Sequence, residues 1–351
     1  MDGLLGDEAE LHAWLVEHGA APEAATAAIR SGHAEALVSD VILTGGAHSS
    51  ARDLAARYGV DLSSVVGMFH DLGVAVPDPD EPLFTDADAA LAETMGSAKS
   101  LGILEGVDVM RVIAGSLERI AEAAVAVYVQ GQEEDLKRRR ASVMECAESN
   151  MRATGLALAI GAGLGPIFQH HLRQAVARQR VMQEGVSAPE MARLVIGFVD
   201  LVESTAMQAD LDPVALGRQV SRFEARAFDV TSAGGGRLVK FIGDEIMVAA
   251  PDPVAGCRIV VDLIDAFTED GTQPRAGLVH GEVLFRHGDY YGPVVNLAAR
   301  LVDAAIPGEA LVDVSVVEAV KDESLAFEPA GRRMVKGFAA PVAVWTLTAD
   351  P

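Results

Sequence analysis

The stretch 237–250 constrains the fold of this chain more than any other part of the sequence. It reads RLVKFIGDEIMVAA, so two apolar runs flank a Gly-Asp pair. Apolar runs on either side of such a pair are typical of a β-hairpin. Lys240 is an isolated charge within the first run, and Asp244 lies at the predicted turn. Because a charge in an apolar strand is costly without a partner, the hairpin predicts a charged site on a β-sheet.

A second carboxylate follows another predicted strand, the run LVIGFV at 194–199, which leads directly into Asp200. Two Asp residues at strand ends of one sheet offer the hard oxygen ligands that Mg²⁺ and Mn²⁺ prefer beside substrate phosphates. Two such ions can bind an attacking oxygen and a leaving group together. Lys240 precedes Asp244 by four positions, a spacing that a strand places on one face. Asp200 and Asp244 are therefore candidate metal ligands, although two such residues alone more often serve as structural caps.

A third feature is the stretch 288–300, with the sequence GDYYGPVVNLAAR. Pro293 suits the first turn of a helix, and Asn296 and Arg300 then lie four positions apart on one helix face. An amide donor beside a guanidinium suits charge that develops on a phosphoryl group. Asp289 lies in the loop just before this helix. Taken alone, Asn296 and Arg300 also fit an ordinary surface pair.

Strands and helices alternate from Met191 onward, whereas the chain before about position 180 is predicted to be almost entirely helical. The alternation predicts an α+β domain of the split-βαβ type, with one helical layer against a mainly antiparallel sheet. We predict a strand at 194–199, a long strand pair at 274–287, and helices at 212–231, 253–269 and 292–304. In the helical half we predict long helices at 111–130 and 133–152.

The C-terminal half resembles the catalytic domain of class III nucleotidyl cyclases, from about position 194 to 347. The matching motifs are FVDLV at 198–202, KFIGD at 240–244, DYYG at 289–292 and NLAAR at 296–300, in the family's order and spacing. The resemblance implies a ferredoxin-like split-βαβ cyclase fold for residues 191–351. It also implies an adenylyl cyclase, a lyase that converts ATP to 3′,5′-cyclic AMP and pyrophosphate.

The resemblance also implies roles for single residues. Asp200 and Asp244 would bind Mg²⁺ or Mn²⁺, two ions in each active site. Asn296 and Arg300 would stabilise the transition state, and Lys336 in the sequence VKG matches the family's triphosphate-binding lysine. In the family each site forms between two catalytic domains, one supplying the aspartates and the other supplying the remaining residues. Because this chain contains all of them, the resemblance implies a head-to-tail homodimer with two equivalent sites.

Lys240 and Asp289 match the pair that selects the purine in this family. Adenine offers an acceptor at N1 and a donor at its 6-amino group, which an ammonium and a carboxylate would satisfy. Guanine offers the reverse pattern and would leave polar groups mispaired. The pair therefore predicts ATP as substrate and disfavours the alternative, a guanylyl cyclase.

Two departures from the family pattern bear on nucleotide affinity. Glu203 and Ser204 stand where the family commonly has Gly-Phe, and Glu282 stands where some relatives carry an arginine toward the triphosphate. Neither departure touches the candidate site residues. A catalytically silent nucleotide-binding signalling module remains the alternative from another functional class, and the complete residue set argues against it.

Residues 1–168 are predicted to form an all-α regulatory domain, and residues 169–190 a linker helix and boundary. The helical half resembles the autoinhibitory regulatory domain of actinobacterial cyclases that respond to pH, a domain also associated with fatty-acid binding. His170 and His171 lie in the predicted linker. An exposed helix is the favoured interpretation of this pair, and a protonation switch is the alternative, since histidine changes charge between pH 5 and 8.

Two other segments of the helical half have an alternative function. The segment 50–72 has the pattern of a helix-turn-helix, but its second half offers almost no Lys or Arg for nucleic acid. A packed helical pair is therefore favoured over a transcriptional regulator. The apolar segment 156–168 is too short to span a bilayer, and core packing is favoured over a lipid pocket.

Composition limits the partners and the compartment. The formal charge of −23, from 51 acidic and 28 basic residues, argues against a nucleic-acid-binding surface. Cys146 and Cys257 are the two cysteines, one in each half, which fits a reducing compartment without disulfides. Acidic residues directly after Met1 do not resemble a secretory signal. We therefore expect a soluble cytoplasmic enzyme without a transmembrane segment.

Overall fold

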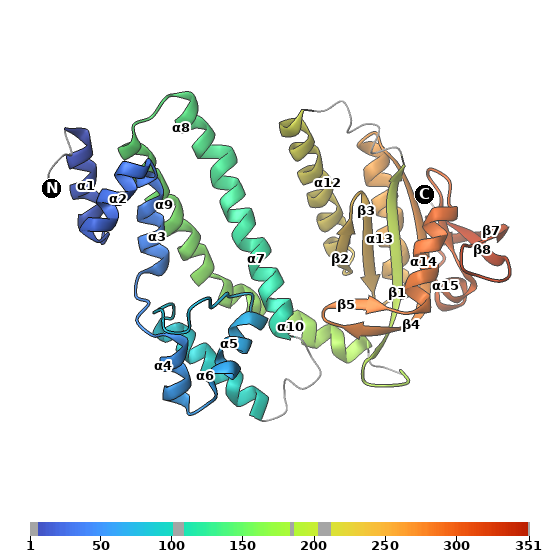
Figure 1. Cartoon of the computed structure of the whole chain (residues 1–351). Helices are drawn as coiled ribbons and strands as arrows, with labels where there is room; N and C mark the ends of the chain where they lie inside the picture. The colour runs from blue at the N-terminus through green and yellow to red at the C-terminus, as the bar shows by residue number, and fades with distance from the viewer. Residues whose placement is uncertain (1–5, 101–108, 183–185, 203–211, 350–351) are drawn as a thin grey trace. The chain divides into compact units, whose positions relative to one another are not determined.

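The computed structural model describes residues 6–100, 109–182, 186–202 and 212–349 (Figure 1). Contacts within the chain divide it into two compact units, Met1–His170 and His171–Pro351.

The N-terminal unit is all-α, as predicted. Its elements are α1 (Asp7–Glu17), α2 (Pro22–Ser31), α3 (Ala34–Thr44), α4 (Ala51–Tyr58), α5 (Leu62–Asp71), α6 (Asp86–Ser100), α7 (Val109–Tyr128), the π-helical turn η1 (Val129–Glu133), α8 (Glu134–Arg138), α9 (Val143–Ala162) and the first residues of α10 (Leu164–Met182).

Two separate apolar clusters hold this unit together. The first joins α1, α2, α3 and α9 around buried Leu15 and Ala147. The second joins α4, α5 and α6 around Leu54, with the stacked rings of Phe69 and Phe84 4.1 Å apart. The apolar face of α5 therefore lies inside its own unit, and the packed helical pair predicted at 50–72 is confirmed.

The single helix predicted at 133–152 is wrong, because α8 ends at Arg138 and a new helix, α9, begins at Val143. Ser142 caps the new helix: its hydroxyl accepts from the backbone N–H of Glu145, and the Glu145 carboxylate accepts from the N–H of Ser142. This reciprocal arrangement satisfies backbone groups that a continuous helix would have paired differently.

The apolar segment 156–168 is not core in this unit. Leu156 is 63% and Phe168 65% exposed, so the predicted core packing is wrong for the single chain. Together α9 and α10 form a helical run, Val143–Met182, that is long and apolar enough to cross a membrane by length and composition. It is the one such helix among the described residues, and a single helix of this kind is weak evidence for a membrane span.

The C-terminal unit is built on an eight-stranded sheet in the order β2-β3-β1-β4-β6-β8-β7, with β5 beside β4. Paired strands are antiparallel except β4 and β6. The strands are β1 (Met191–Val202), β2 (Arg237–Ile242), β3 (Glu245–Ala250), β4 (Gln273–Arg286), β5 (Asp289–Tyr291), β6 (Ala310–Val312), β7 (Leu325–Arg333) and β8 (Val342–Ala349). The hairpin predicted at 237–250 is confirmed as β2 and β3.

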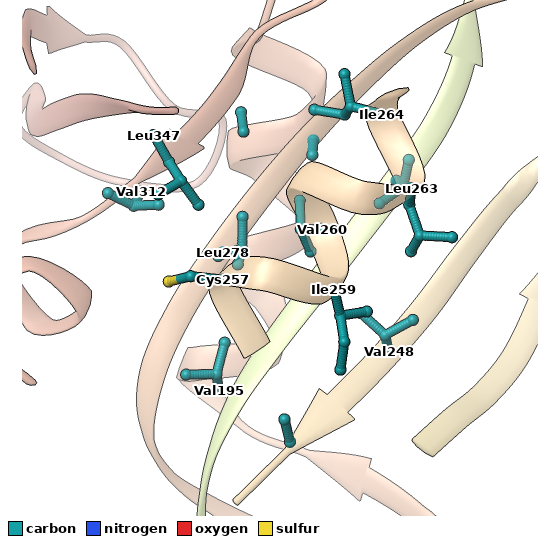
Figure 2. Close-up of a cluster of buried hydrophobic side chains, with 14 of the residues drawn as sticks. Val195, Val248, Cys257, Ile259, Val260, Leu263, Ile264, Leu278, Val312 and Leu347 are labelled. Atoms are coloured by element: carbon teal, nitrogen blue, oxygen red, sulfur yellow. The ribbon is translucent and has the colours of Figure 1, made fainter. Parts of the chain in front are cut away.

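Helices cover both faces of this sheet, so the single helical layer predicted from the sequence is wrong. The helices are α12 (Pro213–Ala233), α13 (Pro253–Glu269), α14 (Pro293–Ala304) and α15 (Val314–Ala319). Alternate residues of β1 face opposite ways: Val195 and Val199 join the core under α12, α13 and α15, whereas Ile196 and Phe198 join the core under α14. Figure 2 shows the first core, with apolar side chains of α13 against the strands.

A glycine allows α14 to lie close against β4. A Cβ atom on Gly277 would come within 2.4 Å of the backbone nitrogen of Val302 and 2.5 Å of the carbonyl oxygen of Ala298. These distances are shorter than real Cβ contacts, so the helix backbone occupies the space that a side chain would need. The position of α14 on the sheet therefore depends on Gly277.

Candidate active site

The first cluster of candidate residues lies where β1 ends. Asp200 pairs in register with Glu245 on β3 and with Arg275 on β4. Directly opposed residues of antiparallel strands have Cα atoms about 5 Å apart and point to the same face. Asp244 precedes Glu245 in the β2–β3 turn, where Gly243 takes a φ of 67°. The fold therefore brings the two predicted metal ligands to the same end of the sheet.

The Asp244 position differs from the sequence prediction in one respect. We predicted that Lys240 and Asp244 share a strand face because they lie four positions apart. The strand β2 ends at Ile242, so Asp244 belongs to the turn and the alternation of a strand does not extend to it.

Arg275 is the main positive charge at this end of the sheet. Its Nε and Nη2 atoms donate to Asp200 Oδ2 over 2.9 and 2.7 Å, and its Nη1 atom donates to the carbonyl oxygen of Asp303 over 3.3 Å. The Asp200 side chain is 17% exposed. Arg275 Nε and Nη2 both bond to Asp200 Oδ2, so Arg275 makes no bond to Asp200 Oδ1.

Glu245 adds a third carboxylate to this cluster. Burial raises the pKa of its carboxyl to about 7, and the nearby charges of Asp200, Asp303 and Asp244 add to the rise, whereas Arg275 opposes it. Carboxylates crowded in this way favour a bound cation. The donor set is hard oxygen, as Mg²⁺ and Mn²⁺ prefer, although among the described residues no group of three or more His, Cys, Asp or Glu side chains is arranged to hold a metal.

Asn296 and Arg300 project from α14, as their spacing predicted. Asn296 is exposed and Arg300 is partly buried. Arg300 Nη1 lies 3.0 Å from Asp303 Oδ2, and Asp303 also accepts from Arg275 through its backbone carbonyl. Bonds therefore connect the helix that carries Asn296 and Arg300 to Asp200 within one chain.

The second cluster lies around Lys240 and Asp289. Lys240 Nζ lies 2.5 Å from Asp289 Oδ2, and the two side chains are 40% and 23% exposed. Asp289 Oδ1 accepts from the backbone N–H of Tyr290 over 2.8 Å. Lys240 is therefore paired with Asp289, the residue with which the family resemblance grouped it.

Three other candidate residues, Lys336, His170 and His171, take no part in the bonds that the described residues of the two clusters make. Lys336 is exposed in a turn after β7. His170 and His171 are exposed on α10, on either side of the division between the two units.

Comparisons with known proteins match both halves of the chain. A family described as adenylate cyclase regulatory domain matches residues 2–181, and a family described as adenylate and guanylate cyclase catalytic domain matches residues 186–349. An uncharacterized protein of Mycobacterium tuberculosis is 34% identical over 98% of this chain and 91% of that protein. A pH-sensitive adenylate cyclase of M. tuberculosis is 30% identical over 97% of this chain and 90% of that protein. The chain belongs to the adenylate cyclase family.

This membership confirms the family that the sequence resembles, the enzyme class and the cyclase fold. Among solved structures, the adenylyl cyclase CyaB from P. aeruginosa is similar at 22% identity, with a TM-score of 0.41, over 46% of this chain and 96% of that chain. This adenylate cyclase homologue matches both family models and, over 97% of its length, the pH-sensitive relative.

Three charged residues at these clusters were not predicted from the sequence: Arg237, Glu245 and Arg275. Arg275 and Arg237 are charges in predicted strands, and the argument that singled out Lys240 applies to both. Glu245 directly follows Asp244, and only the strand pairing shows that it faces Asp200. Its raised pKa comes from burial, which the sequence does not report.

Of the two departures from the family pattern, the structure describes the one at Glu282. Glu282 accepts from Arg193 over 2.8 Å and from Ser187 over 2.7 Å, so its charge is engaged at the beginning of β1. These bonds lower the pKa of Glu282, the Ser187 hydroxyl contributing most. Glu203 and Ser204 lie outside the described residues.

Proposed function

We propose that this cyclase converts ATP to 3′,5′-cyclic AMP and pyrophosphate. The observation that carries the proposal is the Lys240–Asp289 pair, held at 2.5 Å within a domain of the cyclase family. Lys240 would donate to adenine N1, and Asp289 would accept from the 6-amino group. Guanine would present an acceptor to the carboxylate and a donor to the ammonium, an arrangement that hydrogen-bonding sites reject strongly.

In the proposed reaction the ribose 3′-hydroxyl releases its proton to water, its oxygen attacks the α-phosphorus, and the bond from that phosphorus to the bridging oxygen of pyrophosphate breaks. Asp200 and Asp244 would hold two Mg²⁺ or Mn²⁺ ions, which lower the pKa of the attacking hydroxyl and neutralise the leaving group. Asn296 and Arg300 would donate hydrogen bonds to the α-phosphoryl oxygens as charge develops on them. Lys336 would bind the triphosphate as a point charge.

We propose that two chains form each site in a head-to-tail homodimer. In the single chain, Lys240 lies in β2 while Asp244 lies beyond its end, on the order of 10 Å along the chain. Arg300 and Asp200 are each engaged by an oppositely charged neighbour of their own chain. A partner that supplies the Lys240 and Asn296 set to Asp200 and Asp244 would complete the site, and the symmetry would create two of them.

We propose that the N-terminal domain restrains a cytoplasmic catalytic domain and that His170 and His171 report acidity to it. Both histidines are exposed on α10, which continues across the division between the two units. The name of the pH-sensitive relative supports this direction. A fatty acid in the N-terminal domain is proposed on the family resemblance alone. A catalytically silent module is the alternative function.

The test is nucleotide turnover by the full chain and by a fragment 187–351 with Mn²⁺, from ATP and from GTP. We expect cyclic AMP from both proteins, little cyclic GMP, and a faster fragment. A full chain that is faster than its fragment would make the N-terminal domain an activating element. Tight ATP binding without product in either protein would support the silent module.

A further inference from the structure

Asp289 is carried by a short hairpin, so the Lys240–Asp289 contact depends on how that hairpin is held. Asp289 begins β5, a strand of three residues whose pairing is with β4 alone. His287 and Gly288 form the turn between them, both with positive φ, at 54° and 78°. Positive φ at both positions is typical of a tight two-residue turn. Only three positions of β5 pair with β4, so side-chain contacts contribute to the position of Asp289.

Arg237 supplies those contacts on both sides of Asp289. Its Nη2 atom donates to the carbonyl oxygen of Gly288, and its Nη1 atom lies 3.3 Å from the Tyr290 hydroxyl. The guanidinium also lies over the Tyr290 ring, 5.5 Å from the centroid. A planar fork that reaches a backbone carbonyl and a hydroxyl at once is a geometry that lysine cannot reproduce.

Tyr290 anchors this arrangement in the core. It is 3% exposed, and its ring packs against Phe285 with centroids 5.2 Å apart. The residue after Asp289 is therefore fixed by burial, while the residue before it is fixed by Arg237. Asp289 lies between two held neighbours, with its carboxylate bonded to Lys240 Nζ and to the Tyr290 N–H.

A bulge in β2 places Arg237 and Lys240 on the same face. Three positions apart in a regular strand, they would point to opposite faces. The pairing shifts between Leu238 and Lys240, so Arg237 opposes Ala249 and Lys240 opposes Met247. Ala249 and Met247 belong to the same core, which shows that one extra residue has brought both cations to one side.

We propose that Arg237 and Tyr290 form a clamp that positions Asp289 against Lys240 and so sets the preference for adenine over guanine. This inference rests on the proposed function. Arg237 does not bond to the Asp289 carboxylate, so it is a positioning residue that acts through the hairpin. Loss of the clamp would let Asp289 move relative to Lys240, which weakens the match to adenine and relaxes the penalty against guanine.

The test compares kcat/KM for ATP and GTP in the full chain with the Arg237→Gln and Tyr290→Phe variants. We expect Arg237→Gln to lower the ATP-to-GTP ratio about tenfold, the scale of one hydrogen bond. Tyr290→Phe keeps the ring and loses the hydroxyl, so a smaller fall in the same direction is expected. Arg237→Lys should not restore the ratio, because an ammonium cannot hold Gly288 and Tyr290 together.

Arg226→Gln is the matched control, since it removes a partly exposed arginine that pairs with Glu269 on other elements. Its ratio should equal that of the wild type. A folded Arg237→Gln variant with an unchanged ratio, or with equal losses for both nucleotides, would overturn the clamp. If that variant does not fold, an unchanged ratio in Tyr290→Phe overturns it.

Equilibrium binding of ATP and GTP, measured by calorimetry on the same proteins, gives the ratio without turnover. A wild type that binds ATP selectively without product would refute the proposed reaction and leave the clamp measurable. A wild type that binds both nucleotides equally would overturn both the ATP assignment and the clamp.

Discussion

At the scale of single residues, Arg275 balances a crowded group of carboxylates. It bonds to Asp200 and to the backbone of Asp303, while burial raises the pKa of Glu245 beside them. The cost of a charge in an apolar strand was enough to predict that Lys240 has a partner. The cost alone does not identify the partner, because the Lys240–Asp289 contact joins residues that are 49 positions apart in the sequence.

A residue-scale prediction concerns acidity. If His170 and His171 form the proposed switch, the full chain should be more active in mild acid than near neutral pH, because protonation adds positive charge to a histidine. The His170→Ala/His171→Ala double variant should lose this gain while it keeps activity near neutral pH. The measurement is a pH profile of cyclic AMP formation, and an identical profile in the double variant would contradict the switch.

His280→Gln is the control for this experiment. Burial, and then the charge of Arg193, lower the pKa of His280, so it takes up a proton less readily than an ordinary histidine and should not take part in activation. The effect of His280 on stability is a loss as the pH falls. The unfolded chain takes up this proton first as the pH falls below 6.5, so His280 lowers the free energy of unfolding from there toward its lowered pKa.

At the scale of elements, the sequence predicted types and order better than sides and irregularities. The hairpin, and the helix that begins at Pro293, have local causes in turn residues and proline geometry. The second helical layer was missed because periodicity shows that α14 has an apolar face, but not which side of the sheet it covers. The bulge was missed because Leu238 and Val239 are both apolar and leave no break in the pattern.

Gly277→Ala tests how closely α14 packs on the sheet. Gly277→Ala would place a methyl group against the backbone of α14, which carries Asn296 and Arg300. We expect a loss of about 3 kcal/mol in the free energy of unfolding, as for an overpacked core, together with a fall in kcat. Chemical denaturation and steady-state kinetics measure the two effects.

Gly217→Ala is the matched control, because nothing lies within 4 Å of a Cβ at this position in α12. It should stabilise the protein by about 0.5 to 1 kcal/mol, since alanine is the better helix former. A Gly277→Ala protein as stable and active as the wild type would show that α14 does not depend on this contact.

At the scale of the whole molecule, composition and pattern were enough to separate an all-α half from an α+β half. They could not show that the apolar segment at 156–168 is exposed in the single chain, because burial depends on packing that is distant in sequence. They also could not show which site residues meet within one chain. The structure holds Lys240 with Asp289 and Asp200 with Arg275, as two separate clusters.

The central claim is that each active site takes residues from two chains, and complementation tests it most directly. Asp200→Ala removes a proposed metal ligand, and Asn296→Ala removes a proposed transition-state donor, so each purified variant should be inactive with ATP and Mn²⁺. Mixed and allowed to exchange subunits, half the dimers would be mixed, each with one intact site, which restores about a quarter of wild-type activity. Two folded, dimeric variants that stay inactive when mixed, or an Asp200→Ala protein that is active alone, would contradict the account.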